Sequence, residues 1–243
     1  MMKATQHGEY LWKLTRFGVI NCYLVREEEG LTVIDTGMSG SGKGILAAAA
    51  TIGLPIARLT VTHAHGDHVG SLDELHAALP AATVGMNRRT ATFLRDKATL
   101  LPDEPQAKLR GSYVTCGTEA TQLLTPGDRF GSLQVVAAPG HTPDQVAFLD
   151  TRDGTLIAGD AFQTQGGIAV AGIMRWRFPL PAMATWHLPT ALVTARNLAA
   201  LNPTRLAVGH GNVLEAPAAA MGRAIEVAAQ AVRAEAPWQN VAG

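Results

Sequence analysis

The sequence contains few cysteines, few aromatic residues and little charge. Of its 243 residues, two are cysteine, 5% are aromatic and 16% are charged. Cys22 and Cys116 lie far apart and form no C-x-x-C pair. This usage fits a reducing compartment, and we interpret both cysteines as small buried hydrophobic residues.

Positive charge is not concentrated anywhere in the chain. Twenty basic residues balance twenty acidic ones, and no basic cluster is larger than the Arg88-Arg89 pair. A protein that binds a polyanion usually carries a basic patch or stripe. We therefore predict that nucleic acid is not a partner.

Long hydrophobic runs are also missing. No stretch approaches the roughly 18 apolar residues of a membrane span. Residues 1–14 include His7, Glu9 and Lys13 and lack the apolar core of a secretory signal. We expect no membrane partner and a cytoplasmic location.

Apolar residues make up 47% of the chain, enough for a large core. A chain of this length can fold as one unit, so we predict a single domain over residues 1–243. Short runs rich in Val, Leu and Ile, punctuated by Gly and Pro, alternate with helical segments. Strands are predicted at 19–25, 31–34, 59–62, 83–86, 133–137, 145–149, 155–158 and 206–208, and helices at 45–52, 71–78, 190–201 and 217–234.

Two segments do not fit this alternation. Residues 88–110 look helical and polar but contain Pro102 and Pro105. Residues 163–186 have no clean period and include Trp176 and Phe178. We predict inserted, lid-like segments near 88–112 and 163–187, the second of which could supply an apolar pocket.

The Ala-rich closing helix could form a homodimer face or pack on the core.

The motif His-Ala-His-Gly-Asp-His covers residues 63–68 and directly follows a predicted strand. Three imidazoles and a carboxylate in six residues are typical of zinc, iron or manganese ligands. His63 and His65 can point at one ion while Asp67 and His68 point at a second. Further ligand candidates stand at other strand ends: His141, Asp160 and His210.

These motifs resemble the metallo-β-lactamase superfamily. The resemblance runs from Asp35 to Gly211 and includes Asp35-Thr36-Gly37, Pro139-Gly140-His141-Thr142, Gly159-Asp160 and Gly209-His210-Gly211. It implies an α/β fold in which two sheets lie between helices, a four-layer αββα sandwich, with the site at one edge. The same motifs say little about the substrate.

The resemblance also implies a ligand set for two zinc ions. The first ion would be held by His63, His65 and His141. The second would be held by Asp67, His68 and His210, and Asp160 would bridge the two ions. Asp35 would bind neither ion itself and would orient the histidine loop from behind the ligands.

Two such ions would generate a bridging hydroxide near neutral pH and polarise the carbonyl under attack. Asp67 and Asp160 are both candidates to carry a proton to the leaving group.

We expect a small-molecule substrate with a carboxylic ester or lactone bond. Asp at position 160 resembles lactonase-like and glyoxalase II-like members, whereas the familiar β-lactamases have Cys or Ser there. Thr142-Pro143-Asp144 departs from the family's His-Thr-Pro-Gly pattern after the third histidine. Thioesterase or β-lactamase activity at the same site stays open. Two other classes are a mono-iron sulfur dioxygenase and a binding module with a decayed site.

Overall fold

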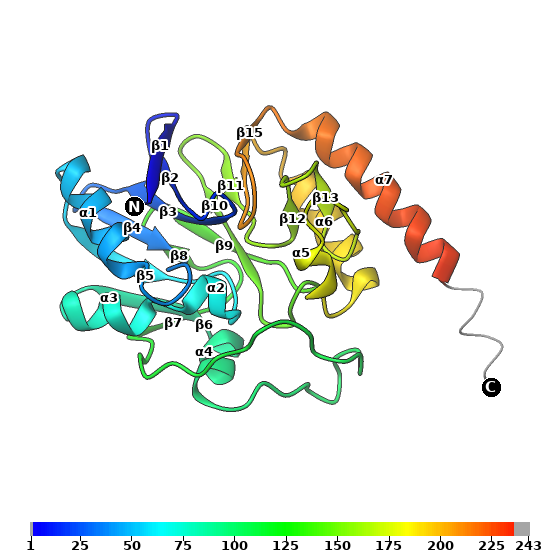
Figure 1. The fold of residues 1–243 in the computed structure, drawn as a ribbon, viewed down its shortest axis with the longest axis horizontal. Helices are drawn as coiled ribbons and strands as arrows, with labels where there is room; N and C mark the ends of the chain where they lie inside the picture. Colours follow the sequence, from blue (N-terminus) through cyan, green and yellow to red (C-terminus); the bar gives the residue numbers. More distant parts are fainter. Residues whose placement is uncertain (1, 236–243) are drawn as a thin grey trace.

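Two β-sheets form the centre of the protein in the computed structural model, which describes residues 2–235 (Figure 1). The first sheet is antiparallel from its first to its fourth strand and parallel from the fourth to the seventh. Its order is β1 (Lys3–His7), β2 (Leu11–Arg16), β3 (Ile20–Arg26), β4 (Leu31–Ile34), β5 (Ile56–Thr60), β6 (Thr83–Asn87) and β7 (Gln122–Leu124).

The second sheet comes from the later part of the chain. Its order is β15 (Leu214–Glu215), β14 (Arg205–Ala207), β11 (Thr155–Ile157), β10 (Val146–Asp150), β9 (Leu133–Ala137) and β8 (Arg129–Phe130). The contact between β11 and β14 is parallel, and the other pairs are antiparallel. A separate short pair joins β12 (Phe162–Gln163) to β13 (Ala169–Val170).

The helices lie outside the two sheets and complete four layers. On the side of the first sheet lie α1 (Gly42–Ile52), α3 (Leu72–Ala78) and α4 (Arg88–Arg95). On the side of the second lie α6 (Leu188–Ala200) and α7 (Ala218–Glu235) (Figure 1). The predicted αββα sandwich is confirmed.

Three apolar clusters hold these layers together. One packs α1, α3 and α4 on the first sheet, and another packs α6 and α7 on the second. The third lies between the sheets, where Tyr23 of one faces Phe148 of the other. Burial of side chains this large stabilises the fold by roughly 1.5–3 kcal/mol each. The closing helix buries Met221, Ala224 and Ala228 against the rest of the chain, so its apolar stripe faces the core.

Parts of the fold differ from the sequence predictions. The strands β1 and β2 were not predicted. In the segment 88–110, predicted to be a helical insertion interrupted by Pro102 and Pro105, the helix α4 ends at Arg95, before either proline, and the rest of the segment is irregular. The segment expected to be irregular over 163–186 contains β13 and a short helix, α5 (Leu180–Met183).

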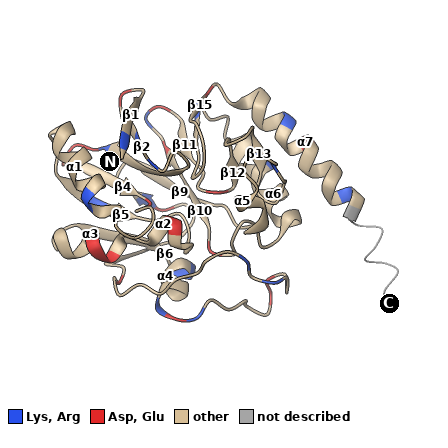
Figure 2. Ribbon diagram, in the orientation of Figure 1, with Lys and Arg blue, Asp and Glu red and all other residues tan. Residues whose placement is uncertain are grey.

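The distribution of charge agrees with the sequence. Lys and Arg are scattered over the ribbon and gather on no single element in Figure 2. Across residues 2–235, the structure contains no helix long and apolar enough to cross a membrane.

Candidate metal centre

The histidine motif forms a sharp turn between a strand and a short helix. Strand β5 ends at Thr60, and the chain then leaves the sheet through His63 and His65. His65 precedes α2 (Gly66–Val69), which carries Asp67 and His68 in its single turn. Three imidazoles therefore enter the same buried volume, with exposed fractions of 3% or less.

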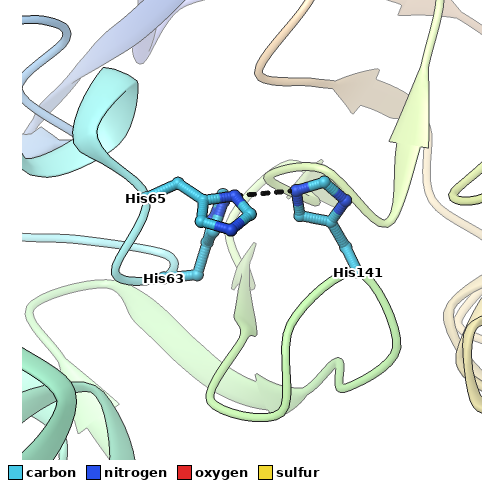
Figure 3. A group of neighbouring side chains, drawn as sticks. All are labelled: His63, His65 and His141. Atoms are coloured by element: carbon cyan, nitrogen blue, oxygen red, sulfur yellow. Dashed lines mark hydrogen bonds between the residues drawn. The ribbon is translucent and has the colours of Figure 1, made fainter. Parts of the chain in front are cut away.

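His141 joins the first two histidines from the loop between β9 and β10. In Figure 3 the rings of His65 and His141 point toward each other, with His63 beside them. His65 Nδ1 lies 3.2 Å from His63 Nε2 and 3.1 Å from His141 Nε2. Ligand nitrogens about 2.0–2.1 Å from a tetrahedral zinc stand about 3.3 Å apart, so these spacings suit one ion.

A second group forms beside the first. Asp67, His68 and His210 each offer a ligand atom within 4.8 Å of the others. Asp160 lies between the two groups, since its carboxylate is 3.4 Å from His141 Nε2 and 3.2 Å from His210 Nε2. His63 also groups with His68 and Asp160, so it stands nearer the second group than the sequence suggested. All seven predicted ligands are brought together.

The outward ring nitrogen of each histidine has a partner. Such partners fix the orientation of a ligating imidazole and determine which nitrogen faces inward. The pairs are His63 Nδ1 with Thr62 Oγ1 at 3.0 Å, His65 Nε2 with Arg110 O at 3.0 Å, His68 Nδ1 with Asp35 Oδ2 at 2.8 Å, His141 Nδ1 with Thr185 Oγ1 at 3.1 Å and His210 Nδ1 with Val19 O at 2.8 Å. Only Asp35 among these partners was predicted from the sequence.

The inward-facing atoms fit a cation. His68 Nε2 and Asp160 Oδ1 are buried, have no hydrogen-bond partner among residues 2–235, and lie 3.5 Å apart. Burial lowers the pKa of His210, but the carboxylates of Asp160 and Asp67 outweigh it and raise that pKa to about 10. A site that concentrates negative charge strongly enough to protonate a buried histidine would also favour a metal ion.

Asp35 holds the histidine turn from behind. Its backbone has a φ of 62°, in the left-handed region that non-glycine residues seldom adopt. The carboxylate accepts hydrogen bonds from the Thr62 backbone N–H at 2.7 Å and from His68 at 2.8 Å. Asp35 thereby ties together the two ends of the ligand turn.

Asp144, in the loop between β9 and β10, holds the same turn, and sequence reasoning missed this role. Its Oδ2 accepts a hydrogen bond from the backbone N–H of Ala64 at 2.9 Å. Burial raises the pKa of the Asp144 carboxyl. The sequence showed that an aspartate stands at position 144, where the family's His-Thr-Pro-Gly pattern has a glycine. It did not show that this aspartate contacts Ala64.

A cavity of about 340 Å³ opens onto the two groups of ligands. Its apolar wall consists of Val19, Ile20, Phe178, Leu180, Pro181, Met183 and Ala184. The predicted loop thus supplies Phe178, but Trp176 is 93% exposed and lies outside the lining. The sequence did not predict that Val19 and Ile20 line the cavity, because it is the turn between β2 and β3 that brings them to it.

Comparison with known proteins agrees with this geometry. Residues 15–210 match the sequence profile of the Metallo-beta-lactamase superfamily. The uncharacterized protein YobT of Bacillus subtilis (strain 168) is 47% identical over 93% of this chain and 99% of its own length. The probable metallo-hydrolase YflN of the same organism is 26% identical over 79% of this chain and 81% of its own length.

A further relative shares part of the chain. The hydroxyacylglutathione hydrolase of Xanthomonas axonopodis pv. citri (strain 306) is 32% identical over 52% of this chain and 41% of its own length. Among solved structures, the DIM-1 metallo-beta-lactamase covers 95% of this chain and 98% of its own, with a TM-score of 0.70 and 16% identity. At that identity the likeness concerns the fold alone.

The sandwich, the ligand turn at its edge and the sequence match over residues 15–210 lead to one assignment. The chain is a metallo-hydrolase and belongs to the metallo-β-lactamase superfamily.

Proposed function

We propose that this protein hydrolyses a carboxylic ester or lactone at a site that holds two zinc ions. The observation that carries the proposal is the cavity, whose lining combines residues of the ligand cluster with an apolar wall. Polar groups that converge in an otherwise apolar pocket suit a substrate with one reactive polar bond on an apolar body.

The residues that would hold the ions divide into two sets around a shared carboxylate. His63, His65 and His141 suit the first ion, and Asp67, His68 and His210 the second, with Asp160 between them. Ions bound there supply Lewis acidity and make water more acidic. Iron or manganese would suit the same donors, so the metal is part of the test.

Asp67 is the better placed of the two candidate proton carriers. Both side chains line the cavity, but that of Asp67 is 32% exposed and that of Asp160 is 3% exposed. Although burial raises the pKa of Asp67, His68 and His210 outweigh it and hold that pKa well below its usual range. Asp67 is therefore ionised and a weak base, and its case as the proton carrier rests on its exposure to the cavity, where its carboxylate can reach water and the leaving group.

A thioester is the second candidate substrate. It is favoured by the partial similarity to hydroxyacylglutathione hydrolases, which are 32% and 31% identical over 52% and 59% of this chain. A thioester carbonyl presents the same reactive centre to the ligand cluster.

The test is metal analysis of protein purified without added metal, followed by turnover of lactones, aryl esters, thioesters and β-lactams. We expect two zinc ions per chain and turnover of lactones or esters, and at least a hundredfold loss of kcat for Asp67→Ala. A preference for thioesters would select the second candidate. One iron per chain with oxygen uptake would overturn the proposal in favour of sulfur oxidation.

A further inference from the structure

A second groove, of about 930 Å³, lies next to the cavity of the metal centre. Its polar lining comes mainly from the first two strands, through Lys3, His7 and Lys13. Thr5, Thr15, Phe17, Gly18, Gly211, Asn212 and Val213 complete it. Within the part of the chain that the structure describes, no aspartate or glutamate belongs to this lining.

The register of β1 and β2 explains why these basic side chains share one face. Lys3 pairs with Thr15, and Thr5 pairs with Lys13, so the odd-numbered residues of both strands point the same way. Leu11 on that face belongs to the apolar cluster between the sheets. The face becomes polar farther along the strands, at Lys13 and Thr15.

The groove and the metal cavity adjoin along two chain segments. In the first segment, Phe17 and Gly18 line the groove while the next two residues, Val19 and Ile20, line the metal cavity. In the second, His210 lines the cavity and Gly211 lines the groove. The two segments are joined by the hydrogen bond from His210 Nδ1 to Val19 O, at 2.8 Å. This ridge separates the two hollows, and consecutive Cα atoms across it are about 3.8 Å apart.

The positive charge in the groove is poorly compensated. Lys13 Nζ donates to Gly211 O at 3.2 Å and contacts Asn212 Oδ1 at 3.5 Å, and both acceptors are neutral. In residues 2–235, neither Lys3 nor Lys13 has a carboxylate within ion-pair distance. Burial, and then the charge of Lys3, lower the pKa of Lys13.

One acidic residue stands near the groove. Glu215 approaches His7 at 3.9 Å, but its carboxylate already accepts a hydrogen bond from Arg205 at 2.7 Å. The groove therefore keeps a net positive charge. An anionic ligand group would gain charge-assisted hydrogen bonds there without displacing an existing ion pair.

We propose that this groove binds a carboxylate at the far end of the substrate's acyl chain. The inference rests on the proposed function and names its substrate class: an ester or lactone of an acid whose apolar chain ends in a carboxylate. The chain would lie along the apolar wall and cross the ridge at Val19, and its carboxylate would reach Lys13 and Lys3.

The test compares aryl half-esters of dicarboxylic acids with the aryl esters of monocarboxylic acids of equal chain length. We expect the wild type to prefer the half-ester once the chain is long enough to cross the ridge. In the double variant Lys3→Gln/Lys13→Gln, the ratio of kcat/KM for half-ester to neutral ester falls about tenfold, which corresponds to about 1.4 kcal/mol. Lys43→Gln removes an exposed lysine on α1, far along the chain from the groove, and should leave the ratio at the wild-type value.

Calorimetric titration with an inert dicarboxylate and a monocarboxylate of equal length separates this inference from the proposed function. If no ester is hydrolysed but the dicarboxylate binds more tightly than the monocarboxylate, and the double variant removes the difference, the groove is supported and ester hydrolysis is not. An unchanged ratio in the double variant overturns the groove. So does equal binding of the two acids by the wild type.

Discussion

The Asp35 carboxylate and the His68 imidazole form a fully buried pair, with Oδ2 and Nδ1 2.8 Å apart. Because the carboxylate accepts the Nδ1 proton, Nε2 is the ring nitrogen of His68 that would bind a metal in the ligand cluster. An amide at position 35 can turn an N–H toward the ring and reverse this arrangement. We predict that Asp35→Asn weakens metal binding by about 10- to 100-fold.

Competition with a chromophoric chelator measures this affinity. Asp96→Asn is the matched control, since Asp96 is exposed and its carboxylate pairs with the neighbouring Arg95. Unchanged affinity in Asp35→Asn would show that the pair does not determine which nitrogen of His68 faces the metal.

Asp144 offers a pair of substitutions that separate its hydrogen bond from its ionisation. Asp144→Gly leaves the buried N–H of Ala64 without an acceptor, which should cost about 1–3 kcal/mol in the free energy of unfolding. Asp144→Asn keeps an acceptor oxygen and should cost much less. Urea unfolding of both variants with metal removed measures the difference, and equal losses would contradict the assigned role.

The raised pKa of Asp144 also predicts a pH dependence. Because the folded pKa lies above the unfolded value, the contribution of this group to stability is present at low pH and is lost as the pH rises through the folded pKa. The stability of Asp144→Asn relative to the wild type should therefore increase with pH. A constant difference between the two unfolding curves would argue against a buried, ionising Asp144.

Phe178 sets the shape of the apolar wall. Its ring lies 5.2 Å from the His210 ring and is 9% exposed. In Phe178→Ala, kcat/KM should fall for long-chain acyl esters by about tenfold more than it falls for acetyl esters. The reason is that an apolar pocket distinguishes substrates that differ in apolar groups by about 1–3 kcal/mol. Trp176→Ala, in the same loop but 93% exposed, is the control. Equal losses on all chain lengths for Phe178→Ala would point to a general disturbance of the site.

Asp73 ties the segment before β7 to α3. Its carboxylate accepts hydrogen bonds from the Cys116 thiol and from both the backbone and the hydroxyl of Thr118. Burial works against ionisation, but these bonds hold the pKa of Asp73 at about 2. A lowered pKa means that the stabilisation is present above the ordinary value of 3.8 and is lost as the pH falls toward 2.

Acid unfolding tests this contribution. Asp73→Asn should be less stable than the wild type at neutral pH, and the difference should shrink between pH 4 and pH 2. Asp103→Asn, at an exposed aspartate in the preceding segment, should follow the wild-type curve. A difference for Asp73→Asn that stays constant down to pH 2 would contradict the assigned linkage.

Much of the metal centre was readable from the sequence because it is local. His63, His65, Asp67 and His68 lie within six residues after a strand, and donor types and spacing at that range already suggest metal binding. His141, Asp160 and His210 follow other strands, and the resemblance to a known family grouped them with the turn. The alternation of strands and helices likewise predicted the layers.

Strand β1 was missed because nearly all of its side chains are exposed, and β2 because its two buried residues, Leu11 and Leu14, are three positions apart and belong to different apolar clusters. Burial there depends on a neighbouring layer that no local pattern records.

The sequence by itself determined the donor atoms, the class of fold and the balance of charge. Only the tertiary structure decided which group carries which contact: that Asp144 supports Ala64, that Val19 holds His210, and that Lys13 lies in a groove beside the cavity. These contacts join residues 80 to 198 positions apart. Their energy comes from burial and from the packing of two sheets, which depend on the whole chain and not on any local pattern.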